Sequence, residues 1–149
     1  MTATSNASWL LLAAMLLIAD ETAQAQLPVA PIDPNQRQVY LVRKDQSDCT
    51  NSDVANVDSP IVSGNVWVTR LSDGSTDIKV ALTATPNTTY HFFLKCARQL
   101  TEIHTDDEGV ANIALTVPTS ATGDIFAFDM YPEGAPSGNK FQSANVTFK

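Results

Sequence analysis

Residues 64–84 decide the fold class, and they read GNVWVTRLSDGSTDIKVALTA. Two apolar stretches, 64–71 and 76–84, flank a short polar segment that contains Asp73-Gly74. An Asp-Gly pair between two apolar stretches is a strong signal for a tight β-hairpin. We therefore expect two antiparallel strands joined by a short turn.

Alternation of apolar and polar residues indicates which faces of these strands are buried. In the strand over 76–84, Ile78, Val80 and Leu82 alternate with polar or small residues, which predicts one buried and one solvated face. In the strand over 64–71 the pattern leaves two sets of side chains competing for the core. These sets are Val66, Val68 and Arg70 on one face, and Trp67, Thr69 and Leu71 on the other.

The remainder of the chain after residue 36 has the same strand-like character. Short segments rich in β-branched and aromatic residues are separated by turns of Asp, Asn, Gly and Pro. Eight short strands at regular spacing, without convincing helical periodicity, are typical of an all-β sandwich or barrel. We expect an antiparallel β-sandwich of seven to eight strands with an immunoglobulin-like architecture. The further strands are predicted at 38–43, 89–96, 99–105, 110–117, 124–130 and 141–148.

The N-terminal segment differs from the rest of the chain. Residues 9–19, WLLLAAMLLIA, are apolar without interruption, which is too short for a membrane-spanning helix but suits the apolar core of a signal peptide. Ala23-Gln24-Ala25 is a small-x-small cleavage pattern. We therefore expect a signal peptide at 1–25, a Pro-rich leader or linker at 26–36, and a single β-sandwich domain at 37–149. The protein would be secreted or periplasmic, with no stable membrane span after cleavage.

The chain has two cysteines, Cys49 and Cys96. In an exported protein two cysteines are expected to pair. Closing a loop of this length stabilises the fold by about 4 kcal/mol in the chain-entropy description. The alternative is a free thiol nucleophile that acts with His91 or His104.

Charge excludes some classes of partner. The chain carries 9 basic and 16 acidic residues, a formal net charge of −7. Loss of Asp20 and Glu21 with the signal peptide would change this to −5. Nucleic acids and anionic membranes are bound by clustered Lys and Arg, and here the basic residues are scattered. We expect neither as a partner.

The segment over 130–140, MYPEGAPSGNK, is the most suggestive binding candidate. It reads as a long loop stiffened by two prolines and turned by two glycines, and it carries Tyr131, Glu133 and Lys140. Loops at the end of a sandwich commonly recognise partners, and an exposed Tyr is a suitable contact anchor. The competing interpretation is that Tyr131 packs on the sandwich and the loop only connects two strands.

Metal and catalytic sites have weaker support. His91 and His104 lie on neighbouring predicted strands, and Glu102 shares a face with His104, so these three are weak candidates for zinc ligands. The acidic turn at 106–109 is a weak candidate for calcium, without the spacing of an EF-hand. Asp129 and Glu133 could form the carboxylate pair of a glycosidase. No cofactor motif is present, so we expect none.

These patterns favour an exported, non-catalytic binding or structural module of the cell envelope or extracellular space. Its partner would be a protein or a glycan. The alternative is a secreted metal-dependent enzyme, superoxide-dismutase-like or hydrolytic, using His91, His104 and nearby carboxylates. A third possibility is an assembly subunit in which the last strand or residues 26–36 pair with a neighbour's sheet edge.

Overall fold

The structure is a computed structural model that describes residues 33–46, 49 and 62–148. The chain divides into two units, Met1–Pro31 and Ile32–Lys149, and the described residues belong to the second. The predicted signal peptide at 1–25 lies outside the described residues, as does most of the predicted leader at 26–36. Export and cleavage therefore stay predictions.

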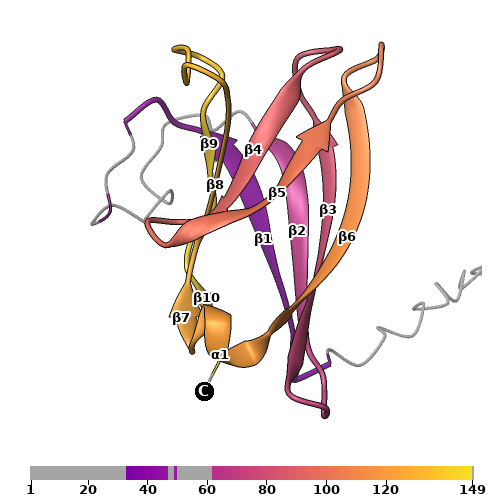
Figure 1. The fold of residues 1–149 in the computed structure, drawn as a ribbon, viewed down its shortest axis with the longest axis vertical. Helices are drawn as coiled ribbons and strands as arrows, with labels where there is room; N and C mark the ends of the chain where they lie inside the picture. Colours follow the sequence, from indigo (N-terminus) through magenta and orange to yellow (C-terminus); the bar gives the residue numbers. More distant parts are fainter. Residues whose placement is uncertain (1–32, 47–48, 50–61, 149) are drawn as a thin grey trace, which may run out of the picture. The chain divides into compact units, whose positions relative to one another are not determined.

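Within the described residues the chain forms ten strands and one short helix (Figure 1). In chain order they are β1 (Gln36–Arg43), β2 (Val62–Arg70), β3 (Ser75–Thr83), β4 (Thr89–Leu94), β5 (Arg98–His104), β6 (Val110–Pro118), α1 (Thr119–Thr122), β7 (Ile125–Phe126), β8 (Phe128–Pro132), β9 (Phe141–Gln142) and β10 (Val146–Thr147).

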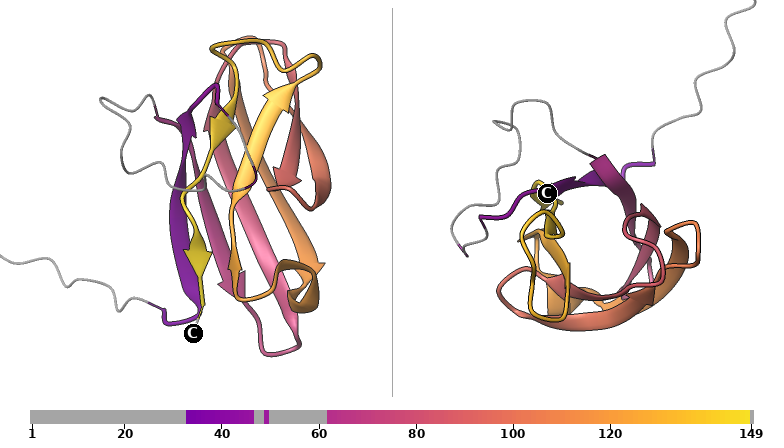
Figure 2. Two further views of the ribbon diagram at one scale, coloured as in Figure 1. Left: turned by 90° about the vertical axis from the view of Figure 1, so that its left-hand side faces the viewer. Right: turned by 90° about the horizontal axis from the view of Figure 1, so that it is seen from above.

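Eight of these strands form one antiparallel sheet in the order β5-β4-β8-β9-β1-β2-β3-β6, and β7 pairs with β10 separately. Seen along the strands, the ribbon runs round a ring, so that the edge strands β5 and β6 approach each other (Figure 2). Closing a sheet in this way leaves little unpaired edge. The predicted antiparallel all-β fold is confirmed, as a nearly closed sheet with a sandwich-like or barrel-like form.

The hairpin over 64–84 forms as predicted. The amide of Leu71 donates to the carbonyl of Ser75 at 2.9 Å, which closes the turn between β2 and β3. Gly74 has a φ of +84°, a left-handed conformation that glycine adopts without a steric penalty. Val66 and Val68 are fully buried, so the structure decides the competition in β2 and leaves Trp67 on the outer face.

The core lies inside the ring and is built from alternate residues of each strand. In β4, Tyr90, Phe92 and Leu94 point inward while His91 and Phe93 point outward. The rings of Phe92 and Phe128 stack at 5.0 Å between centroids and anchor the contact between β4 and β8. Other buried members are Val39, Leu41, Val66, Val68, Ile78, Val80, Leu82, Ile103, Met130, Phe141 and Val146.

Three predicted segments differ from the structure by more than a small shift of a strand end. Residues 118–123, predicted as a loop, contain α1, whose four residues are too few to show helical periodicity. The predicted strand at 124–130 is interrupted at Ala127 and continues to Pro132. The predicted strand at 141–148 breaks at residues 143–145, where the Ser143 hydroxyl accepts a hydrogen bond from the Phe128 amide at 2.9 Å.

Cys49 and Cys96 form the predicted disulfide, with their Cα atoms 5.5 Å apart. Both cysteines are thereby used, which removes the free-thiol alternative. Cys96 lies in the turn between β4 and β5, so the bond joins this turn to the segment that follows β1. No helix in the described part of the chain has the length and apolar character to cross a membrane.

Candidate functional site

The outer face of β5, β4 and β8 carries a cluster that we call the acidic–aromatic site. It consists of His91 and Phe93 from β4, Glu102 from β5, Tyr131 from β8, and Glu133 just after β8. Because the inward residues of β4 are apolar and fully packed, the two-residue period of the strand directs His91 and Phe93 away from the core.

Two aromatic rings form the centre of the site. Phe93 and Tyr131 stack with their centroids 4.9 Å apart and their planes at 20°. Tyr131 was predicted in a loop, but it lies in β8, where it pairs with His91 in register and is partly buried. The interpretation that Tyr131 packs on the sheet is therefore the better one, although its ring packs on the outer face rather than in the core.

Two carboxylates bracket the imidazole of His91. Its Nδ1 lies 3.5 Å from Glu102 Oε1, and its Nε2 lies 3.3 Å from Glu133 Oε2. Glu102 reaches the ring because it pairs with His91 across β4 and β5. Glu133 reaches it from the first residue after β8, with a side chain that is almost completely exposed. Glu133 thus comes to the site together with Tyr131, as the sequence predicts for a shared binding segment.

A β-bulge contributes one more polar group. The register between β4 and β5 shifts between Phe92 and Phe93, so that Phe93 faces Gln99. A bulge of this kind re-aims side chains, and it places Gln99 Nε2 3.3 Å from His91 Nδ1. Gln99, Phe93 and Tyr131 line an open depression of about 300 Å³ together with His91, Pro132, Glu133, Gly134 and Ala135.

Two ionisable groups of β8, Asp129 and Tyr131, have raised pKa values. Burial raises the pKa of the Asp129 carboxyl to about 6, although Lys95 nearby acts in the opposite direction. Burial also raises the pKa of the Tyr131 phenol, and the negative charge of Asp129 raises it further. Asp129 Oδ1 is buried without a hydrogen-bond partner among the described residues. Tyr131 therefore stays a neutral hydrogen-bonding group over the physiological range.

Lys140, the third residue predicted with Tyr131 and Glu133, takes part in a different contact. Its Nζ lies 3.4 Å from the carbonyl oxygen of Asp45. The Asp45 carboxylate accepts hydrogen bonds from the Ser137 hydroxyl at 2.5 Å and the Gly138 amide at 2.6 Å, which hold the pKa of Asp45 below its usual value. Lys140 thus helps to fasten the 133–140 loop to the segment after β1.

The residues proposed as metal ligands have other partners. His104 Nδ1 lies 2.9 Å from Thr89 Oγ1, across the strand pair. Among the described residues, no group of three or more His, Cys, Asp or Glu side chains could hold a metal ion. His91, His104 and Glu102 therefore gain no support as a metal centre.

The acidic turn at 106–109 uses its leading carboxylate to close itself. Asp106 Oδ1 accepts hydrogen bonds from the amides of Glu108 at 3.0 Å and Val110 at 2.7 Å. This is the ordinary role of Asp in a tight turn. As for the carboxylate pair, Asp129 is buried and does not line the depression to which Glu133 contributes. Neither cluster is arranged in a way that favours the proposed calcium or glycosidase chemistry.

Sequence reasoning missed two members of the site, Phe93 and Gln99. Phe93 could have been found, because it lies two residues from His91 on the same strand face. Gln99 could not have been found. It lies three residues before Glu102, so strict alternation would place the two side chains on opposite faces of β5, and only the bulge brings Gln99 to His91. No protein-family model matches the chain, and no curated protein matches it by sequence.

Proposed function

We propose that this chain is an exported, non-catalytic β-sheet module of immunoglobulin-like architecture that binds a partner protein through the acidic–aromatic site. The single observation that carries the proposal is the stacked Phe93–Tyr131 pair beside His91, whose imidazole lies between the carboxylates of Glu102 and Glu133. The partner would present a Lys or Arg side chain at its contact surface.

The chemistry of the site favours a cation. The faces of aromatic rings attract Lys and Arg groups, and carboxylates at the rim strengthen this attraction. Tyr131 offers a phenol hydroxyl that can donate or accept a hydrogen bond, and burial raises the pKa of this phenol further above the physiological range. The net charge, which is −7 for the full chain and −5 after loss of the predicted signal peptide, would steer a basic partner toward the molecule during encounter. In many interfaces most of the binding energy comes from a few anchors of this kind, in which an aromatic ring lies beside a charge pair that loses its water on binding.

The N-terminal sequence and the disulfide support export. Residues 9–19 and the Ala23-Gln24-Ala25 pattern suit a cleaved signal peptide. A disulfide persists in oxidising compartments outside the cytoplasm. Expression of the full chain with a C-terminal tag tests this part, since N-terminal sequencing of the exported protein should begin at Gln26. Retention of the whole chain inside the cell would contradict it.

Binding can be tested with short peptides of matched length. A peptide with an exposed Arg-rich segment should bind the exported protein, and a peptide with Arg replaced by Gln should bind at least about tenfold more weakly, since each lost charge-assisted contact is worth about one such factor. Tyr131→Ala and Glu133→Gln should each weaken the Arg peptide by about tenfold.

Tyr40→Ala is the matched control, because Tyr40 is an exposed aromatic residue on a strand outside this site. It should leave the affinity for the Arg peptide unchanged. Equal affinity of the two peptides, or an equal loss in Tyr40→Ala and Tyr131→Ala, would show that the attraction is only that of the overall negative charge.

A further inference from the structure

The outer face of β1, β2, β3 and β6 carries a second, chemically different set of side chains. The registers place two rows across it. One row runs Tyr40, Asn65, Ala81, Asn112, and the adjacent row runs Gln38, Trp67, Lys79, Ala114. We call six of these, Gln38, Tyr40, Asn65, Trp67, Lys79 and Asn112, the amide face.

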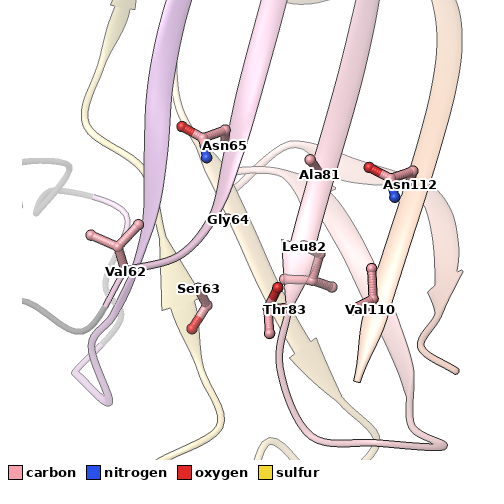
Figure 3. Close-up of a pocket in the computed structure, with 9 residues that line it drawn as sticks. All are labelled: Val62, Ser63, Gly64, Asn65, Ala81, Leu82, Thr83, Val110 and Asn112. Atoms are coloured by element: carbon pink, nitrogen blue, oxygen red, sulfur yellow. The ribbon is translucent and has the colours of Figure 1, made fainter. Parts of the chain in front are cut away.

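Small residues leave open space on this face between its polar side chains. Asn65 and Asn112 stand on either side of Ala81, whose methyl group leaves the space between the two amides open (Figure 3). Gly64 also lines this hollow, and a Cβ at this position would come 2.6 Å from the Ala81 carbonyl oxygen. Glycine is required there because β2 and β3 approach so closely.

Trp67 borders the neighbouring hollow. Two adjoining hollows, of about 260 and 390 Å³, share Ala81 and Asn112 in their walls. Trp67 and Lys79 line the larger one beside the small side chain of Ala114. Tyr40, which is 53% exposed, lies diagonal to Trp67 across β1 and β2. The face therefore offers two aromatic surfaces with amide groups between them.

The polar groups of this face are available for a ligand. Gln38 Nε2 donates to Asn65 Oδ1 at 2.8 Å, which fixes the orientation of the Asn65 amide. The N–H groups of Asn65 take no part in this hydrogen bond. Within the described part of the chain, the side chains of Asn112 and Lys79 make no hydrogen bond or ion pair. An amide supplies both donors and acceptors, as a ligand rich in hydroxyl groups requires.

Charge narrows the class of ligand. The amide face has a single ammonium group and no carboxylate, in a protein with a net charge of −7. The nearest carboxylate in the register, Asp77 in the next row, accepts a hydrogen bond from the Thr116 hydroxyl at 2.6 Å. Apart from the ammonium group of Lys79, the face consists of neutral amides and aromatic rings, which match an uncharged ligand that is apolar on one side and polar at its edges.

We infer that the amide face binds a neutral oligosaccharide, with sugar rings stacked on Trp67 and Tyr40 and their hydroxyl groups bonded to Asn65 and Asn112. A sugar ring presents C–H groups on its face and hydroxyl groups round its edge, so it can satisfy the indole and the amides at once. A basic protein partner, as proposed for the acidic–aromatic site, fits less well, because this face carries an ammonium group and no carboxylate.

Intrinsic fluorescence provides a direct test. The chain contains two tryptophans, Trp9 and Trp67, so that in a Trp9→Phe chain the emission comes from Trp67 alone. The probes are neutral oligosaccharides of β-linked glucose, β-linked N-acetylglucosamine, β-linked xylose and α-linked glucose. An oligomer of uronic acid tests whether a charged saccharide binds instead, and a peptide of similar size tests whether the ligand is a peptide. At least one neutral oligosaccharide should shift or quench the emission in a saturable manner.

Variants then locate the binding. Asn112→Ala should weaken the saccharide by about tenfold, the effect of one lost hydrogen bond with its unpaired partner. Asn65→Ala should do the same, which protects the test if one variant folds poorly, and circular dichroism reports on folding. Phe93→Ala lies in the acidic–aromatic site and should leave saccharide affinity unchanged.

The inference is overturned if no neutral oligosaccharide changes the emission at millimolar concentration, or if only the uronic acid oligomer or the peptide does. It is also overturned if Asn65→Ala and Asn112→Ala bind as the parent does. Because these measurements do not involve the Arg peptide, their failure leaves the proposed function intact, and the reverse is also true.

Discussion

On the outer face of β5, β4 and β8, a stacked aromatic pair lies beside a histidine between two carboxylates, whereas on the outer face of β1, β2, β3 and β6 amides lie beside two separate aromatic rings. Both faces follow from the same alternation, and both cover the same core. Core positions of a sheet must satisfy packing, while outer positions are free of that demand. The packing of the core therefore does not require the difference between the two faces, and the two proposed ligands would account for it.

The two faces also differ in how they are held. The amide face lies on regular stretches of its ladders. β2 pairs with β3 and β3 with β6 without a register shift, and the shift between β1 and β2 falls beyond Tyr40, between Leu41 and Val42. The acidic–aromatic site depends on a bulge in β5, on a loop residue, Glu133, and on a turn fastened by the disulfide at Cys96. Regular sheet is more rigid than turns and loops. We expect perturbations near the disulfide to affect the acidic–aromatic site first.

The largest expected effect is that of removing the disulfide. The double variant Cys49→Ser, Cys96→Ser should lower the free energy of unfolding by about 4 kcal/mol, measured by urea denaturation, because it releases the loop between the cysteines. Under native conditions the Arg peptide should bind more weakly while the saccharide response of Trp67 persists. Equal losses of binding affinity at both faces would show that the disulfide supports both faces to the same extent.

A smaller effect is expected from Asp129. Its pKa is raised in the folded state from 3.8 to about 6, so folding favours the protonated form. The stability that this contributes is complete below pH 3.8 and is lost as the pH rises through 6. A shift of this size corresponds to at most about 3 kcal/mol, and solvent screening reduces it.

Asp129→Asn should therefore stabilise the protein at pH 7 by about 1 to 2 kcal/mol, since it removes a buried charge. Urea denaturation from pH 4 to pH 7 measures this, and the variant should lose the decrease in stability that the parent shows between pH 4 and pH 6. The amide face, which contains no carboxylate, should bind saccharide equally in both proteins. An identical pH dependence of stability in parent and variant would show that Asp129 is not the responsible group.

The smallest effects on stability are expected from single exposed charges, one on each face. Glu102→Gln and Lys79→Gln should each change the free energy of unfolding by less than about 0.5 kcal/mol, because both side chains are exposed. Their binding effects should differ. Glu102→Gln should weaken the Arg peptide and reduce the salt dependence of its binding.

Lys79→Gln should leave the salt dependence of saccharide binding near zero, as in the parent, because the ligand is uncharged. Calorimetric titrations at low and high salt measure both quantities. A strong salt dependence at the amide face would indicate a charged ligand and remove the distinction between the two faces.

Part of the candidate site was accessible from the sequence. The segment with Tyr131 and Glu133 was predicted as a binding region, and both residues do lie in one cluster. Lys140 was grouped with them only because it is near in the chain, and the structure turns it toward Asp45. His91 was predicted for a metal and instead lies between two carboxylates. Residue type indicated that these positions have chemistry to offer, but not which neighbours they meet.

The sequence by itself determined the antiparallel strands, the hairpin at Asp73-Gly74 and the pairing of the two cysteines. Alternation and turn residues are local signals, and two cysteines allow a single pairing. Only the tertiary structure decided that Trp67 faces outward, that Gln99 reaches His91, and that Asn65 and Asn112 border one hollow. Those outcomes depend on register, bulges and closure of the sheet, which arise from contacts between residues far apart in the chain.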